Sequence, residues 1–296
     1  MTDAARSLTL EPLWRGAVQR WQCDENDHLN VRFHFAIVAE ALAFLFRTRF
    51  GRAAPRVRRQ HARFVAEARV ATPLLARGGL VRTTVDAVSV YVEIVGAIGG
   101  EGAAVHSTFC CELDLPPATL DLDPATLPGE RALPSHGARR GLPEPIAADA
   151  LPTLTRAEAL PMVEIGRGVF PRDAGPEDFV GRISDGILRL IAHVHGDGSV
   201  SDRQDGRIGG AVVEYELIYP RPAPAGTVFV ARSGIAALEG RAQRFCHWLF
   251  DADSGEMLCG SNAVAVALDL ETRRAAQFTP EQRATIEARC VPELVL

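Results

Sequence analysis

Four polar residues at alternate positions form the stretch with the clearest capacity for chemistry: Asp24-x-Asn26-x-His28-x-Asn30. They bring a carboxylate, an imidazole and two amides close together in the chain. Amide and imidazole N–H groups can donate hydrogen bonds to an oxygen that gains negative charge, and a carboxylate can take a proton from water. These residue types therefore suit the attack of water on a carbonyl group.

A long apolar segment, Val31–Phe50, follows this stretch directly. Its apolar side chains surround a helix axis instead of forming one stripe, which predicts a helix buried on nearly all sides. Such a helix would be about 30 Å long. The polar residues would then lie at its entrance, next to the N–H groups that the first helical turn leaves without partners.

Strands are predicted around this helix. Leu13–Trp21 reads as a strand that leads into the polar stretch, and the run Val88–Ile94 alternates with the period of a half-buried strand. The other predicted elements of this half are strands at His61–Ala71, Leu80–Val88 and Ala104–Leu113, with a turn at 99–102.

The same order of elements recurs after a Pro-, Ala- and Gly-rich stretch, which predicts an internal duplication. The strand end Leu113-Asp114-Leu115 returns as Leu268-Asp269-Leu270, and Asp27 and Asp178 are each expected to precede a helix. The second half is predicted to hold a strand at Val163–Phe170, a helix at Arg182–His195, and strands at Ala211–Tyr219, Thr227–Ala236, Arg241–Phe250 and Met257–Leu268. We therefore predict an α+β protein with one domain at 1–118, a linker or covering strap at 119–155, and a second domain at 156–296.

The polar stretch resembles the D-x-N-x-H-x-N signature of hotdog thioesterases, at the start of their central helix. The resemblance extends to plant-type acyl-ACP thioesterases and to bacterial acyl-CoA thioesterases of the 4-hydroxybenzoyl-CoA thioesterase superfamily. It implies a double hotdog fold, in which each of two long helices is wrapped by an antiparallel sheet. It also implies hydrolysis of an acyl-CoA or acyl carrier protein thioester, without a cofactor or a metal ion.

In the plant-type enzymes a Glu from the next strand joins the Asp, Asn and His, in a context similar to R-R-E-C. Glu67 matches that residue, whereas Ala68 stands where those enzymes carry Cys. The resemblance thus implies Asp24, Asn26, His28 and Glu67 as catalytic groups, with no Cys nucleophile. Either Asp24 or Glu67 could take the proton of water or attack directly; we favour water attack with Glu67 as the base and Asp24 orienting Asn26 and His28.

Each of these residues also has a structural interpretation. Asp24 or Asn30 could cap the helix, His28 could be a structural histidine, and Glu67 could be a solvated strand residue. Asn30 is also a candidate for substrate binding, together with Arg56, Arg58 and Arg59. These three arginines belong to an Arg-rich segment that is either a solvated face or a contact for the phosphates of coenzyme A or for an acidic carrier protein.

The second half departs from the signature. The stretch 173–181 contains neither His nor Asn, so we expect one site per chain, in the first half. Across the whole chain, His, Cys and carboxylate residues do not stand at the spacing of metal ligands, so we predict that the protein needs no metal ion.

Two other functions stay open. Enoyl thioester hydratases also pair hotdogs with an Asp and a His at the helix entrance, but usually with four residues between them, where Asp24 and His28 have three. The other alternative is a non-catalytic acyl-thioester-binding protein. It would need the apolar pocket but not the four polar residues Asp24, Asn26, His28 and Glu67.

Composition narrows the partners. The net charge of −5 argues against nucleic acid, and 47% hydrophobic with 23% charged residues is typical of a soluble globular protein. Charged residues within Val31–Phe50 argue against a membrane span, and the N-terminus lacks an apolar signal core. Six cysteines without metal-ligand spacing suggest reduced thiols and a cytoplasmic location. A homodimer of double hotdogs is compatible with all of this.

Overall fold

The structure, a computed structural model, describes residues 10–83, 86–98, 103–115, 117–120, 142–196 and 208–296, with the single residues 122, 127, 129 and 133. The chain divides into two compact units, Met1–Pro143 and Glu144–Leu296, hereafter the first and the second unit. The predicted turn at 99–102 and much of the predicted linker lie outside the described residues.

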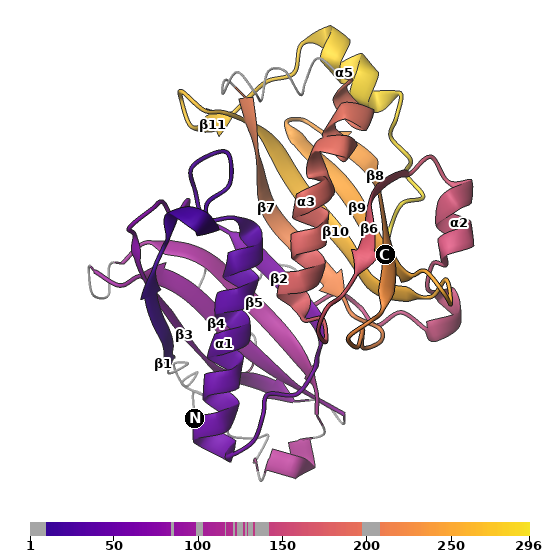
Figure 1. Cartoon of the computed structure of the whole chain (residues 1–296). Coiled ribbons are helices and arrows are strands. Elements are labelled where there is room, and N and C mark those ends of the chain that lie inside the picture. Colours follow the sequence, from indigo (N-terminus) through magenta and orange to yellow (C-terminus); the bar gives the residue numbers. More distant parts are fainter. Residues whose placement is uncertain are drawn as a thin grey trace, which may run out of the picture. The chain divides into compact units, whose positions relative to one another are not determined.

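The first unit consists of a long helix and an antiparallel sheet (Figure 1). Its elements are β1 (Glu11–Ala17), the short 3-10 helix η1 (Arg20–Gln22), α1 (Val31–Phe50), β2 (Val57–Phe64), β3 (Pro73–Thr83), β4 (Ala87–Gly96), β5 (Val105–Asp114) and the 3-10 helix η3 (Pro117–Leu120). The strand order is β1-β3-β4-β5-β2, with antiparallel pairing throughout.

The second unit repeats this arrangement. Its elements are η6 (Ala148–Ala150), α2 (Leu154–Ala159), β6 (Val163–Val169), α3 (Pro176–His195), β7 (Ile208–Ile218), β8 (Val228–Glu239), β9 (Ala242–Asp251), β10 (Met257–Asp269), β11 (Arg274–Ala275) and α5 (Pro280–Glu287). The order β6-β8-β9-β10-β7 is that of the first sheet when strands are counted within each unit. The repeated topology confirms the predicted duplication, and β5 and β10 end at its matching anchors, Asp114 and Asp269.

Helix α1 has the predicted bounds, because both of its ends are capped. The Asn30 side chain accepts a hydrogen bond from the Arg32 N–H at 3.0 Å, and Gly51 adopts the left-handed φ of 66° that commonly ends a helix. The core side of α1 packs on the sheet, with Phe35 in edge-to-face contact with Phe109 of β5. The prediction of burial on nearly all sides was wrong, since Phe44 is half exposed and Glu40 and Arg47 face solvent with it.

Four predicted element bounds were also wrong. Strand β3 runs from Pro73 to Thr83, where a strand at Leu80–Val88 was predicted. The strand before the polar stretch ends at Ala17, and η1 follows it. Helix α3 begins at Pro176, so Asp178 lies inside it, where its carboxylate accepts a hydrogen bond from the Gly175 N–H at 3.0 Å. Strand β2 runs from Val57 to Phe64 and therefore ends before Glu67.

In each unit, residues from outside the sheet pack on some of its side chains or glycines. In the first unit Leu133 and Leu142 pack near Tyr91 and Cys110. In the second unit the chain end does the same, because Leu294 and Leu296 lie where a side chain at Gly234 or Gly260 would otherwise be. Among the described helices, none is long and apolar enough to cross a membrane.

Candidate active site

A tight turn at the entrance of α1 brings Asp24 and His28 together. The Asp24 N–H donates to the His28 carbonyl at 3.0 Å, and the Asp27 N–H donates to the Asp24 carbonyl at 3.1 Å. Asp27 adopts a left-handed φ of 62°, which Asp tolerates better than most residues. The turn is closed by an antiparallel bridge between Cys23 and Leu29.

Within this turn, Asp24 is the central acceptor. Its Oδ1 accepts a hydrogen bond from the Asn26 N–H at 2.9 Å and lies 3.0 Å from Nδ1 of His28. When the imidazole is protonated, this contact is an ion pair. Both side chains are nearly buried, which strengthens this pairing relative to a surface pair.

The pairing changes the titration of His28. Burial alone lowers the pKa of the imidazole, but the carboxylates of Asp24 and, more weakly, Glu67 raise it by more. The net result is a pKa above the usual value. The protonated ring, which donates hydrogen bonds from both nitrogens, is therefore favoured more than in an ordinary histidine.

The two amides of the motif have different environments. Asn26 is buried, at 4% exposure, in the turn beside Asp24. Asn30 is the N-cap of α1, and its side-chain oxygen is occupied by the Arg32 N–H. The capping interpretation is thus confirmed for Asn30.

Glu67 lies on a loop and not, as predicted, on a strand. The N–H groups of Val65 and Ala66 both donate to the His106 carbonyl, at 2.8 and 3.2 Å, which ends the regular pairing of β2 with β5. The Glu67 side chain is 31% exposed and lies 3.6 Å from the guanidinium of Arg69.

This loop, residues 65–72, is bonded to the Asp24–His28 turn. The Leu29 N–H donates to the Ala68 carbonyl at 2.7 Å, and His28 and Arg69 form an antiparallel bridge. The structure thus brings the loop of Glu67 beside the motif at the helix entrance, and the charge of Glu67 reaches His28.

Sequence reasoning missed a buried pair beside this turn. Nδ1 of His34, on the first turns of α1, lies 2.9 Å from Oγ of Ser107 on β5. Burial, with the neighbouring His106 and His28, lowers the pKa of His34 to about 3, so its ring is neutral. The only sequence signal was a histidine among the apolar residues of the first turns of the predicted helix.

Two aromatic rings border the same entrance. Trp21 of η1 is 71% exposed and meets Phe33 of α1 edge-to-face, with ring centroids 5.4 Å apart. The guanidinium of Arg32 lies 5.2 Å from the centre of the Phe33 ring. An exposed tryptophan next to a buried polar cluster is a feature that can contact an apolar ligand.

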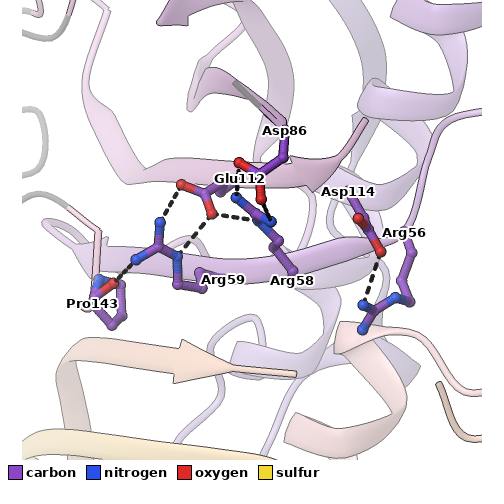
Figure 2. Close-up of polar contacts among 7 residues, drawn as sticks. All are labelled: Arg56, Arg58, Arg59, Asp86, Glu112, Asp114 and Pro143. Carbon is purple, nitrogen blue, oxygen red and sulfur yellow. Dashed lines mark hydrogen bonds and ion pairs between the residues drawn. The ribbon is translucent and has the colours of Figure 1, made fainter. Parts of the chain in front are cut away.

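The structure does not bring the predicted substrate-binding arginines to this entrance. Figure 2 shows them in ion pairs near the start of β2: Arg56 with Asp114 at 3.0 Å, and Arg58 with both Asp86 and Glu112. Arg59 pairs with the fully buried Glu112 and also donates to the Pro143 carbonyl. From Arg59 to Phe64, where β2 ends, the strand spans about 17 Å at roughly 3.3 Å per residue.

These ion pairs have a structural reason that the sequence did not reveal. A buried carboxylate such as Glu112 is costly unless it is paired and hydrogen-bonded. Arg58 and Arg59 meet that need, and their positive charges are balanced within the first unit.

In the second unit, the stretch that matches the motif makes contacts that stabilise the start of α3. Its acidic residue, Asp178, binds the Gly175 N–H and the Arg172 guanidinium at the start of α3. At the other end, Nε2 of His195 lies 2.6 Å from the Gln243 side chain. These contacts hold the helix ends.

No protein-family model matches the sequence, and no curated protein matches it significantly. Solved structures do resemble the chain. A protein described as an oleoyl thioesterase from Lactobacillus plantarum shares 12% identity at a TM-score of 0.61, over 89% of this chain and 98% of its own. The 12:0-ACP thioesterase of Umbellularia californica shares 8% identity at a TM-score of 0.57, over 87% and 94%.

The name of the fold comes from the same comparison. A protein of Alicyclobacillus acidocaldarius with the hot dog fold shares 11% identity at a TM-score of 0.50, over 90% of this chain and 98% of its own. The chain therefore has the double hotdog fold, as predicted, and that fold is the one found in these acyl thioesterases. At such low identity the likeness establishes the fold alone.

Proposed function

We propose that this protein hydrolyses an acyl thioester of coenzyme A or of acyl carrier protein at the entrance of α1. The observation that carries the proposal is the Asp24–His28 pair, 3.0 Å apart, with the loop of Glu67 bonded to the same turn. The solved structures named above as thioesterases share the fold that positions this pair.

The side chains then divide the work. His28, with Asn26 and N–H groups of the helix entrance, donates to the carbonyl oxygen, which gains negative charge as water attacks the carbonyl carbon. Glu67 takes the proton of that water and later gives it to the leaving thiolate. Asp24 orients His28 and keeps it a donor, which agrees with the direction of the His28 pKa.

The substrate class also fits the surroundings of the site. An acyl chain needs apolar contacts, and the exposed ring of Trp21 with Phe33 offers them beside the catalytic groups. The nearby Arg32 supplies a positive charge for the anionic carrier portion. We assign the Arg56–Arg59 segment no part in this contact, because its charges are already paired.

The test is the release of free thiol from a panel of acyl-CoAs and acyl carrier protein thioesters. We expect turnover of at least one substrate, and the preferred carrier identifies the class. Crotonyl-CoA distinguishes a thioesterase from an enoyl thioester hydratase, because loss of its enoyl absorbance without thiol release would indicate a hydratase. Tight binding of the whole panel with no turnover would contradict catalysis and favour an acyl-thioester-binding protein.

A further inference from the structure

Two successive residues of β5 support the two parts of the candidate site. The carbonyl of His106 accepts the N–H groups of Val65 and Ala66, at 2.8 and 3.2 Å, and so fixes the loop that carries Glu67. The next residue, Ser107, has its hydroxyl 2.9 Å from Nδ1 of His34 and so fixes the first turns of α1. Ser107 also pairs in register with Phe64, the residue where β2 ends.

A chain of contacts leads from Ser107 to the catalytic candidates. The His34 ring contacts Ser107, and the Leu29 backbone, which directly follows His28, is near enough to raise the pKa of that ring. The Leu29 N–H donates to Ala68, which directly follows Glu67. Both members of the pair are buried, His34 at 4% and Ser107 at 0% exposure, so water does not replace the bond easily.

We propose that His34 and Ser107 are positioning residues, which hold the Asp24–His28 turn at a fixed distance from the Glu67 loop. Neither side chain acts on the substrate in this scheme. Loss of the hydroxyl leaves Nδ1 of His34 buried without its partner, and the helix entrance then shifts relative to the loop. A misplacement of about 1 Å can cost about a hundredfold in rate. The expected effect on the rate rests on the proposed function, whereas the expected effect on the placement of the turn and the loop does not.

The second unit provides a matched control. Oγ of Ser233 on β8 lies 2.8 Å from Nδ1 of His247 on β9, and both residues are buried. His247 also has a pKa lowered by burial to about 3. The two Ser–His pairs are alike in distance, burial and titration, but the second lies in the unit whose matching stretch lacks the motif.

The experiment compares Ser107→Ala, Ser107→Thr and Ser233→Ala in the full chain. For each variant, urea unfolding gives the stability, thiol release gives kcat and KM, and NMR gives the titration midpoint of the His28 ring, assigned with His28→Gln. Asp24, Glu67 and His34 interact electrostatically with that ring, His106 acts on His34, and the Arg69 backbone is bridged to His28, so the midpoint reports the placement of these groups.

We expect both Ala variants to lose similar stability. Ser107→Ala should lower kcat by roughly tenfold to a hundredfold with KM little changed, and it should shift the His28 midpoint. Ser107→Thr keeps the hydroxyl and should restore both readouts, and Ser233→Ala should change neither. If Ser107→Ala does not fold, Ser107→Cys, with similar volume and a weak donor, replaces it.

The positioning role is wrong if Ser107→Ala and Ser233→Ala affect kcat and the His28 midpoint equally, or if neither variant affects them. Should the wild-type protein hydrolyse no thioester, the proposed function fails separately. The His28 midpoint then decides the positioning role by itself: a shift in Ser107→Ala alone supports it, and no shift overturns it.

Discussion

At the scale of single residues, the site depends on one carboxylate that serves two partners. Asp24 accepts the Asn26 N–H and faces His28, and both side chains are nearly buried. An electrostatic pair in this setting is stronger than on the surface, and it biases the imidazole toward its charged form. Two predictions belong to this scale.

The first prediction concerns the pH dependence of stability. Burial lowers the pKa of His28, but Asp24, with smaller contributions from the His28 backbone and Glu67, more than offsets this, so the folded-state pKa lies above the unfolded value. The stabilisation is complete below the unfolded pKa and is lost as the pH rises through the folded pKa. Asp24→Asn should therefore lower the free energy of unfolding more at about pH 6 than at about pH 9.

Urea unfolding at both pH values measures this difference. Asp27→Asn is the control, because Asp27 lies in the same turn but is largely exposed and, among the residues that the structure describes, forms an ion pair only with Arg20, at 3.4 Å. A loss of stability in Asp24→Asn that is the same at both pH values would contradict the charge pairing.

The second prediction concerns Glu67. Glu67→Gln keeps the shape of the side chain but removes the base, so kcat on the best thioester should fall by roughly a hundredfold or more. Glu164→Gln is the control in the second unit, because the Glu164 side chain is 27% exposed and also pairs with an arginine. Wild-type kcat in Glu67→Gln would remove Glu67 from the mechanism.

At the scale of elements, the long helix of the second unit lies against its sheet through a close contact that one residue permits. That residue is Gly186 of α3. A Cβ there would lie 2.3 Å from the Ile165 carbonyl oxygen of β6, which is backbone and cannot move aside cheaply.

The third prediction therefore runs against helix propensity. Alanine favours a helix interior over glycine by about 1 kcal/mol, yet Gly186→Ala should destabilise the protein, by about 1–3 kcal/mol, because it forces α3 away from β6. Gly166→Ala on β6 itself should have little effect, since a Cβ there meets nothing within 4 Å. Thermal or urea unfolding checks both variants, and equal stability for the two would refute the close-contact explanation.

At the scale of the whole molecule, two units with one topology carry different residues at the same place. The turn before α1 holds Asp24, Asn26 and His28, whereas the chain before α3 holds a helix cap. From a duplicated fold with one such motif we predict one site per chain.

The fourth prediction tests this asymmetry. A non-hydrolysable acyl thioether should bind with a stoichiometry of about one per chain in calorimetry. Asp178→Asn should leave kcat unchanged while costing about 1 kcal/mol of stability, because it weakens the cap of α3. Two equivalent ligands per chain, or a loss of turnover in Asp178→Asn, would place a second site in the second unit.

The sequence by itself determined the features that depend on neighbours in the chain. An apolar run with Asn before it and Gly after it specifies the bounds of α1, because caps and helical periodicity are local properties. The Asp24–His28 pair is also local, since one tight turn brings the two side chains together. The repeated element order, with its matching strand ends, was readable for the same reason.

Only the tertiary structure decided the rest, because those features depend on partners distant in the sequence. Glu67 lies outside the predicted strand because the His106 carbonyl accepts two successive N–H groups, which ends the regular pairing of β2. Arg58 and Arg59 became partners of a carboxylate that β5 buries beside them. His34 met Ser107 from 73 residues away, and no local pattern could specify a hydrogen bond that exists only when helix and sheet pack together.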